Sequence, residues 1–492
     1  MKRAIIALSL IMLVFGFSSC RQTTVVPPWV LFPQEKEWSV TINGTDPVNT
    51  DSVQTVELKE NETYQLPVLT ADGFEFQGYT AGDGISYQAG DVLTYEDNGL
   101  VLTAIWKSIV IVDGSASFEE ALASGADIIE LNETASPTSP VSIPAGRSIT
   151  IRGTGEGMTE MKALFTLGDG AELRLENIKL TNDTASQDLI TIPSGSASVT
   201  ISGSELTTAS NGDAINVSPG TENVDISISN TIINLNPAAG GEAYGASNGI
   251  RIGDNESTTS VGNAIIKLDN VHMQDNGGGN ASAMPIDFHY VNQFDIDIQD
   301  SEFDIKKTHY IRINNSGNNS IESSITMTNT KMTGYMILAV NNSQNINVDV
   351  IGGSYKSINQ LTGSSNATSM FQLNETSDSS IDISGATITF GKNDTSCAKM
   401  QVFKVMGNSS SENSSVSLTN CTLDTEGLNI TNRIYIGTVY RTDRKNSATI
   451  DSTTANSLQD DVANLTGVWS LKEDTGTVGG GISYQYTKPF GT

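Results

Sequence analysis

The feature that most constrains the fold is a short apolar pattern that recurs between residues 115 and 455. Each copy reads apolar-x-apolar-x-(Asn, Gly or Asp), and successive copies start 23 to 40 residues apart. A strand with two apolar residues cannot bury itself, but stacked copies form continuous apolar columns inside a solenoid. The copies begin at Ile149, Leu173, Val199, Ile226, Ile266, Ile296, Ile325, Val348, Ile381 and Val416.

A second pattern of alternating apolar residues lies between these copies, so each coil carries at least two short strands. It begins at Phe165, Ile190, Ile215, Ile250, Ile286, Ile311, Leu338, Phe371 and Phe403. The last position of the first pattern takes residues that tolerate left-handed backbone, as a sharp turn in every coil requires. Residues 108–455 are therefore predicted to form a right-handed parallel β-helix of about ten coils in an all-β chain. Leucine-rich repeats are the main alternative, but their fixed Leu and Asn ladder is absent.

The stretch before the first coil favours the same architecture. Ser117 to Glu120 form a capping box that begins a helix, and Gly125 can end it. A short helix there protects the edge strands at the open end of a β-helix. With Ile128–Leu131 it resembles the N-terminal start of the pectate-lyase-like superfamily fold, which implies architecture but no catalytic motif. Residues 456–492 lack the repeat and are predicted to form a C-terminal cap.

Residues 38–107 alternate short apolar runs with Gly, which predicts antiparallel hairpins. Leu66-Pro67, Gly73-Phe74-x-Phe76-x-Gly78-Tyr79, Tyr87-x-Ala89-Gly90 and Leu102-Thr-Ala104-Ile-Trp106 together resemble the Listeria–Bacteroides repeat, which is similar to the internalin B-repeat. That family usually has Trp where this chain has Tyr79. The resemblance implies a small β-grasp-like module of bacterial surface proteins, a spacer or adhesion module without catalysis. We expect its aromatic residues to form its core.

The first 19 residues predict a signal peptide. Lys2 and Arg3 precede the apolar stretch 4–17, which is too short for an ordinary membrane-spanning helix. Phe17-Ser18-Ser19-Cys20 resembles a bacterial lipobox, which implies cleavage before Cys20 and lipid on that residue. An ordinary signal peptide followed by an unrelated Cys is the alternative. Residues 20–37 then form a tether, and we expect a protein of the cell envelope held to a membrane by its N-terminal lipid.

Composition excludes several classes of function. The net charge of −29 repels phosphate backbones, so a nucleic-acid partner is not expected. Three His and three Cys exclude a histidine-rich metal site and a disulfide-dense scaffold. We predict no metal and no cofactor, except Ca²⁺ if the protein is a lyase. Cys397 and Cys421 lie about one coil apart, and either a disulfide between them or two free buried thiols is compatible with that spacing.

The strand register supplies the candidate site. The outward middle residues of the second pattern include Arg251, Asp287 and Arg312, which stacking would place in one column on adjacent coils. His289 and His309 fall in the same stretch. A polysaccharide lyase would need a base and a cation there, and a hydrolase would need two carboxylates about 5–10 Å apart. A glycan-binding surface and a purely structural ion network are the alternatives.

These observations favour a membrane-anchored surface lipoprotein with a non-catalytic adhesive or polysaccharide-binding β-helix. Its partner would be a polysaccharide or a host or surface protein. The alternative is a polysaccharide lyase or glycoside hydrolase that acts on the outer face of the β-helix. The missing catalytic signatures of the polygalacturonase-type hydrolases and of the pectate lyases favour the first.

Overall fold

The computed structural model divides the chain into two compact units, Met1–Trp106 and Lys107–Thr492, and each is described by itself. Among the described residues, no helix is both long and apolar enough to cross a membrane. The structure describes residues 37–113, 117–138, 140–237, 247–276, 283–305, 309–318, 320–334, 336–358, 368–391, 400–406, 412–424, 435–440, 445–451, 453–454, 457, 469–474 and 481–486.

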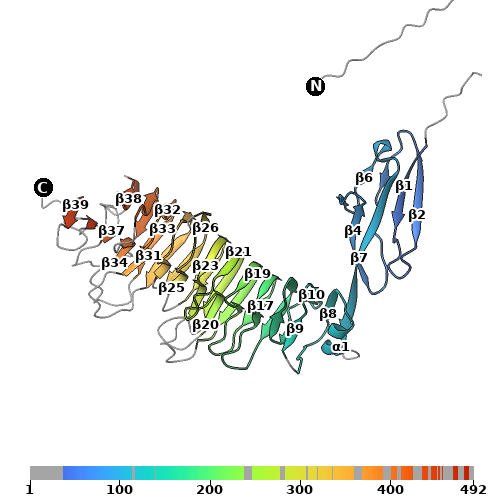
Figure 1. Ribbon diagram of the computed structural model, residues 1–492, viewed down its shortest axis with the longest axis horizontal. Helices are drawn as coiled ribbons and strands as arrows, with labels where there is room; N and C mark the ends of the chain where they lie inside the picture. The colour runs from blue at the N-terminus through green and yellow to red at the C-terminus, as the bar shows by residue number, and fades with distance from the viewer. Residues whose placement is uncertain are drawn as a thin grey trace, which may run out of the picture. The chain divides into compact units, whose positions relative to one another are not determined.

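The first unit is a small β module with its own core. Its main sheet pairs β1 antiparallel with β2 and parallel with β7, and β4 lies beside β7 (Figure 1). Trp38 is almost fully buried and donates its indole N–H to the Lys59 carbonyl, and Phe76 packs edge-on against Tyr79 and Trp106. The elements are β1 (Glu37–Asn43), β2 (Val53–Lys59), β3 (Tyr64–Gln65), β4 (Phe74–Ala81), β5 (Ser86–Tyr87), β6 (Val92–Leu93), η1 (Tyr95–Asp97) and β7 (Leu100–Val112).

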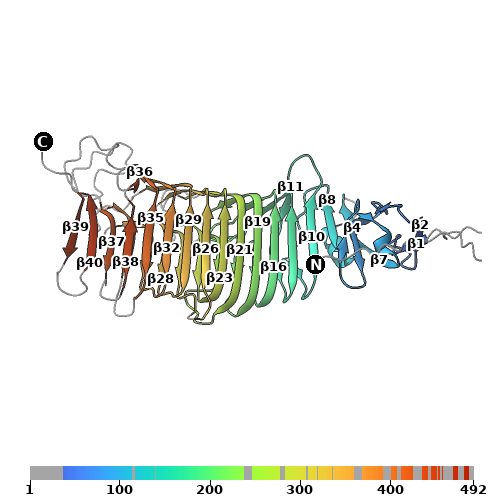
Figure 2. The same ribbon diagram turned by 90° about the horizontal axis from the view of Figure 1, so that it is seen from above.

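The second unit is a parallel β-helix, and Figure 2 shows its strands side by side. All ten strands of the first sequence pattern are present, with β8 before them and β38 after them. This first strand set is β8 (Ile128–Leu131), β10 (Ser148–Gly153), β13 (Ala171–Glu176), β16 (Gly195–Ser202), β19 (Thr221–Leu235), β21 (Val261–Asp275), β23 (Val291–Gln299), β26 (Ser323–Thr328), β29 (Ile346–Ile351), β32 (Ser380–Ser384), β35 (Ser415–Thr419) and β38 (Ser447–Ile450).

All nine strands of the second pattern are also present, in a separate sheet. They pair parallel with one another, and β37 pairs antiparallel with β40 of a hairpin in the predicted cap region. The members are β9 (Val141–Ile143), β12 (Phe165–Leu167), β15 (Ile190–Ile192), β18 (Ile215–Val217), β20 (Ser247–Ile252), β22 (Ala283–His289), β25 (His309–Asn314), β28 (Met336–Asn341), β31 (Thr368–Asn374), β34 (Met400–Met406), β37 (Tyr435–Tyr440), β40 (Gly481–Tyr486) and β39 (Trp469–Asp474).

A further set of strands follows the first set, in most coils after two turn residues, and the long strands β19 and β21 continue directly into it. These short strands stack in parallel on one another. They are β11 (Thr159–Lys162), β14 (Ile178–Thr181), β17 (Glu205–Thr207), β24 (Glu302–Asp304), β27 (Lys331–Gly334), β30 (Ser354–Ile358), β33 (Thr387–Gly391) and β36 (Thr422–Asp424).

The turn residue between these two sets has left-handed backbone, as the sequence predicts. Asn177, Asn230 and Asn329 have φ of 54°, 48° and 51°. Gly153 is the exception among the ten positions, because it is not among the residues with positive φ. A Cβ added there would lie 2.5 Å from the Asn177 carbonyl oxygen, so close backbone approach explains this glycine.

Inward residues form continuous columns because the strands stack in register. Ile201, Ile228 and Leu268 pair on successive coils, and each is at most 1% exposed. A fully buried aliphatic side chain of this kind contributes roughly 1.5–3 kcal/mol. The helix α1 (Phe118–Ala123) precedes the coils with the predicted capping box at Ser117, and its buried Phe118 packs on the same core.

Candidate functional site

The register places the predicted residues in one column of the second-pattern sheet. Asn216, Arg251, Asp287 and Arg312 pair in turn on β18, β20, β22 and β25. Period-two alternation sends the flanking Ile, Val and Phe side chains inward, which fixes the direction of the polar side chains between them. The column itself therefore matches the sequence prediction.

The accessibility of the column differs from the prediction. Asp287 is 2% exposed and His289 is fully buried, so neither lies open on an outer face. Arg312 donates from Nε to Asp287 Oδ1 and from a terminal nitrogen to Oδ2, both at 2.7 Å. His289 Nε2 lies 3.1 Å from Asp287 Oδ1. A carboxylate held by a bidentate arginine and a histidine is a closed ion network.

Electrostatics agree with a permanently ionised Asp287. Burial by itself would raise the pKa of Asp287, but hydrogen bonds from His289 and Arg312, together with the Arg312 charge, lower it to about 2. Arg251 does not join this pair: it lies 3.1 Å from Asp254 on the turn after β20. Arg251 and Asp287 are therefore neighbours in register but belong to different ion pairs.

A second polar group adjoins the column and was not predicted. Asp188 lies just before β15, Asp213 lies just before β18, and Asn248 lies in β20. Each stands three residues before the outward residue of its strand. Asp213 Oδ1 accepts hydrogen bonds from the Asn248 backbone N–H at 2.7 Å and side-chain amide at 2.8 Å. Asp188 accepts from the Asp213 N–H at 2.9 Å. The recurring sequence Asp/Asn-x-Ile-x-(Ile/Val) is the signal that could have identified it.

Asp213 is the carboxyl group of this region that holds a proton near neutral pH. Burial is the largest cause, and the Asp188 charge adds to it, while the Arg251 charge and the hydrogen bonds from Asn248 oppose it. Together they raise the pKa of Asp213 to about 7. Raised carboxyl pKa values are frequent at functional sites and also occur in structural networks.

Unsatisfied buried atoms also gather here. Among the described residues, the buried side-chain atoms without a hydrogen-bond partner include Asn248 Oδ1, Arg251 Nε and His289 Nδ1. Each such atom costs about 1–3 kcal/mol. No three His, Cys, Asp or Glu side chains of the described ranges come together as a metal-binding group would require.

Three predicted site residues are not tested by this geometry. His309 begins β25, but its side chain is outside the described set, as are Cys20 and Cys397 in full. Cys421 is a buried free thiol whose Sγ lies 3.4 Å from the Ile383 carbonyl oxygen.

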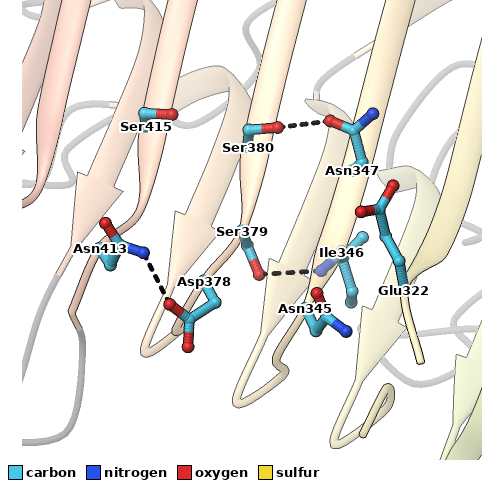
Figure 3. A pocket seen from close by; sticks show the side chains of 9 residues that line it. All are labelled: Glu322, Asn345, Ile346, Asn347, Asp378, Ser379, Ser380, Asn413 and Ser415. Atoms are coloured by element: carbon cyan, nitrogen blue, oxygen red, sulfur yellow. Dashed lines mark hydrogen bonds between the residues drawn. The ribbon is translucent and has the colours of Figure 1, made fainter. Parts of the chain in front are cut away.

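A separate groove of about 430 Å³ opens over the coils that contain β29, β32 and β35. Figure 3 shows two rows of side chains, each with one residue per coil. Asn347, Ser380 and Ser415 form the row on the strands, and Asn345, Asp378 and Asn413 form the row at the turns before them. The turn residues have left-handed backbone, with φ of 56°, 48° and 56°. Sequence reasoning missed this second left-handed turn.

Comparisons with known proteins add little to this geometry. No family model and no curated protein matches the chain. Among solved structures, the chain is similar to the catalytic domain of a GH87 alpha-1,3-glucanase variant in complex with tetrasaccharides. The TM-score is 0.32 with 12% identity, over 82% of this chain and 78% of that chain. It is also similar to Bacteriophage CBA120 tailspike protein 3, with a TM-score of 0.30 and 11% identity, over 72% of this chain and 62% of that chain. Similarity at this level carries no functional conclusion.

Proposed function

We propose that this protein is a lipid-anchored bacterial surface protein whose β-helix binds polysaccharide without cleaving it. The observation that carries the proposal is an array of polar side chains on the outer face of the first strand set. Ser324, Asn347, Ser380 and Ser415 pair in register on β26, β29, β32 and β35. Parallel strands lie about 4.8 Å apart. The array therefore offers hydrogen-bonding groups at a regular spacing, which suits a polymer with repeated hydroxyl groups.

The next column of the same face has the same character. Thr326, Asp349, Asp382 and Ser417 pair on the same strands, while Ile325, Val348, Ile381 and Val416 between the two columns are buried. The array is therefore polar across its width and rests on a rigid core. A rigid surface loses little conformational entropy when a ligand binds.

The absence of cleavage is supported by the closed network at Asp287. Its carboxylate is saturated by Arg312 and His289 and lies out of solvent. A general base must reach the proton that it removes, and Asp287 has no open side from which to do so.

Anchoring remains a proposal from sequence. The lipobox-like run at Cys20 supports lipid attachment in the cell envelope, and residues 20–37 with the Listeria–Bacteroides-like module would act as tether and spacer. Radiolabelled palmitate fed to cells that express the full chain tests it. We expect label in the wild type and none in Cys20→Ala, and label in both would contradict the assignment.

Binding without cleavage is tested on a polysaccharide array with the protein that starts after Cys20. We expect retention on at least one glycan, with no new reducing ends or unsaturated products, with or without Ca²⁺. Product release would overturn the non-catalytic proposal. Retention on no glycan would overturn the binding proposal and favour a host or surface protein as the partner.

A glycoside hydrolase is the second candidate, because Asp213 resembles a general acid. Its pKa is raised, and its backbone N–H donates to the Asp188 carboxylate on the adjacent coil, so two carboxyl-bearing residues are neighbours, as the acid and the nucleophile are in retaining enzymes. Asp213 is 5% exposed, so a substrate would have little access to it. If the wild type releases sugar, Asp213→Asn should reduce the rate at least 100-fold. An unchanged rate would exclude Asp213 as the acid.

A further inference from the structure

We infer that the groove over β29, β32 and β35 binds an uncharged, hydroxyl-rich glycan segment that lies across successive coils. This inference rests on the proposed glycan-binding function and adds to it a site and a ligand class. The groove of about 430 Å³ lies between the strand row and the turn row defined above. Ser379 and Ile346 lie between the two rows, and Glu322 lies at one end (Figure 3).

The groove exists because of how each coil turns. The left-handed residues Asn345, Asp378 and Asn413 lie at the end of the preceding turn, and each strand starts one or two residues after them. The row at the turns and the row on the strands therefore repeat together with the coil spacing of about 4.8 Å. Ser379 Oγ accepts the Ile346 N–H at 3.2 Å, so the surface between the rows is already satisfied. The groups left to form hydrogen bonds with a ligand are therefore the side chains of the two rows.

Those side chains are hydrogen-bonding groups. Asn413 donates to Asp378 Oδ1 at 2.7 Å, and Ser380 donates to Asn347 Oδ1, so neighbouring coils hold each other's side chains in place. Neither the Glu322 carboxylate nor the Ser415 hydroxyl has a hydrogen-bond partner among the described residues. Asn345 also donates to the Asn318 carbonyl and Asn347 to Asp349, so each of these amides keeps one N–H for a ligand. Such N–H groups beside unpaired acceptors suit ligand hydroxyls, which can donate and accept.

Charge selects the class of glycan. The groove is lined by the carboxylates of Glu322 and Asp378, and the described residues of its lining include no Lys, Arg or His and no aromatic ring. A uronate or sulfate group would meet like charge in a chain of net charge −29. A hydroxyl group instead forms a charge-assisted hydrogen bond to a carboxylate. The ligand is therefore a neutral polysaccharide, bound through hydrogen bonds rather than through stacking on rings.

The test uses dextran, mannan and a β-1,3-glucan as neutral probes, and polygalacturonate and alginate as acidic ones. The groove variant is Asp378→Gly with Asn413→Gly, because glycine keeps the positive φ of both positions while it removes their side chains. The matched control is Asn270→Gly with Asp300→Gly, which changes one amide and one carboxylate at left-handed positions outside the groove. A second variant, Asn347→Ala with Ser415→Ala, changes the strand row without touching a turn.

We expect wild type and control to bind at least one neutral probe, and both groove variants to bind it at least ten-fold more weakly at unchanged melting temperature. Equal binding by the groove variants would overturn this inference and leave the proposed function standing. Retention on acidic probes alone would overturn the ligand class. Retention on no probe would overturn the inference, and the proposed function would then stand only if another glycan of the array retained the protein. If one groove variant unfolds, the other decides the outcome.

Discussion

At the scale of single residues, the closed pair of Asp287 and Arg312 dominates the candidate site. Arg312→Met should lower the free energy of unfolding by about 3–5 kcal/mol, because it leaves a buried carboxylate without its countercharge. The matched control is Arg251→Met, whose partly exposed pair with Asp254 should cost less than about 1 kcal/mol. Guanidinium denaturation of the intact protein measures both. Equal losses of unfolding free energy in the two variants would show that the buried Asp287 pair stabilises the protein no more than the partly exposed pair does.

Asp213 should make stability depend on pH. Its pKa is about 7 in the folded chain, against about 3.9 for an unfolded aspartate. Its contribution is therefore fully present below pH 4 and is lost as the pH rises through 7. Asparagine can still accept both hydrogen bonds from Asn248, so Asp213→Asn should melt at a higher temperature than the wild type at pH 8.

The difference in melting temperature between Asp213→Asn and the wild type should grow from pH 4 to pH 8. Asp297→Asn, on the exposed face of β23, controls for the loss of one negative charge. A difference that stays constant with pH would contradict the raised pKa of Asp213.

The site could be predicted only in part, for reasons visible in these residues. Alternation along the strands was enough to align Arg251, Asp287 and Arg312. It could not show that Asp287 is buried, because burial depends on everything that packs over a coil. Asp188 and Asp213 were missed because a carboxylate two residues before a strand looks like an ordinary turn residue.

At the scale of elements, the left-handed turn residues hold the coils in shape. Asn329 has φ of 51° at the turn between β26 and β27. Asn329→Gly should change the melting temperature little, since glycine adopts this backbone freely. Asn329→Val should cost about 1–2 kcal/mol, because a β-branched side chain is strained there. Thermal denaturation compares the two, and equal stability would show that the turn tolerates any residue.

Buried hydroxyl groups also stabilise the same turns, because they form hydrogen bonds with backbone groups there. Ser301 Oγ accepts the Val271 N–H at 3.0 Å and donates to the Gln299 carbonyl at 2.8 Å. Cys421 holds the equivalent position, with Sγ 3.5 Å from the Thr419 carbonyl oxygen. Its thiol thus stands where other coils carry a hydroxyl. That contact accounts for the burial of its thiol.

The strands of both sequence patterns were predictable, and the third set was not. Each of the predicted strands has two apolar residues in alternation, repeated often enough to exceed chance. A strand such as β24 (Glu302–Asp304) buries only Phe303. A segment with one apolar residue in three shows no alternation from which a strand could be recognised. Only stacking on the neighbouring coils makes such a segment a strand.

At the scale of the whole molecule, two separate cores predict two unfolding transitions. Trp38 lies in the core of the first unit, and Phe303 lies in the core of the β-helix. Replacing a buried aromatic residue by alanine costs about 3–5 kcal/mol. In calorimetry, Trp38→Ala should lower one transition and Phe303→Ala the other. If either variant shifts both transitions equally, the units unfold as one.

The in-register stacking of coils has a consequence for how such a gene can change in length. Each coil meets its neighbours through the same edge and the same apolar columns, as Ile201, Ile228 and Leu268 illustrate. The junction left by losing or duplicating one complete coil therefore resembles the junctions already present. A part-coil insertion would shift every column beyond it, unless it left the solenoid as a loop. Selection can thus adjust the number of repeated sites in whole coils without redesigning the core.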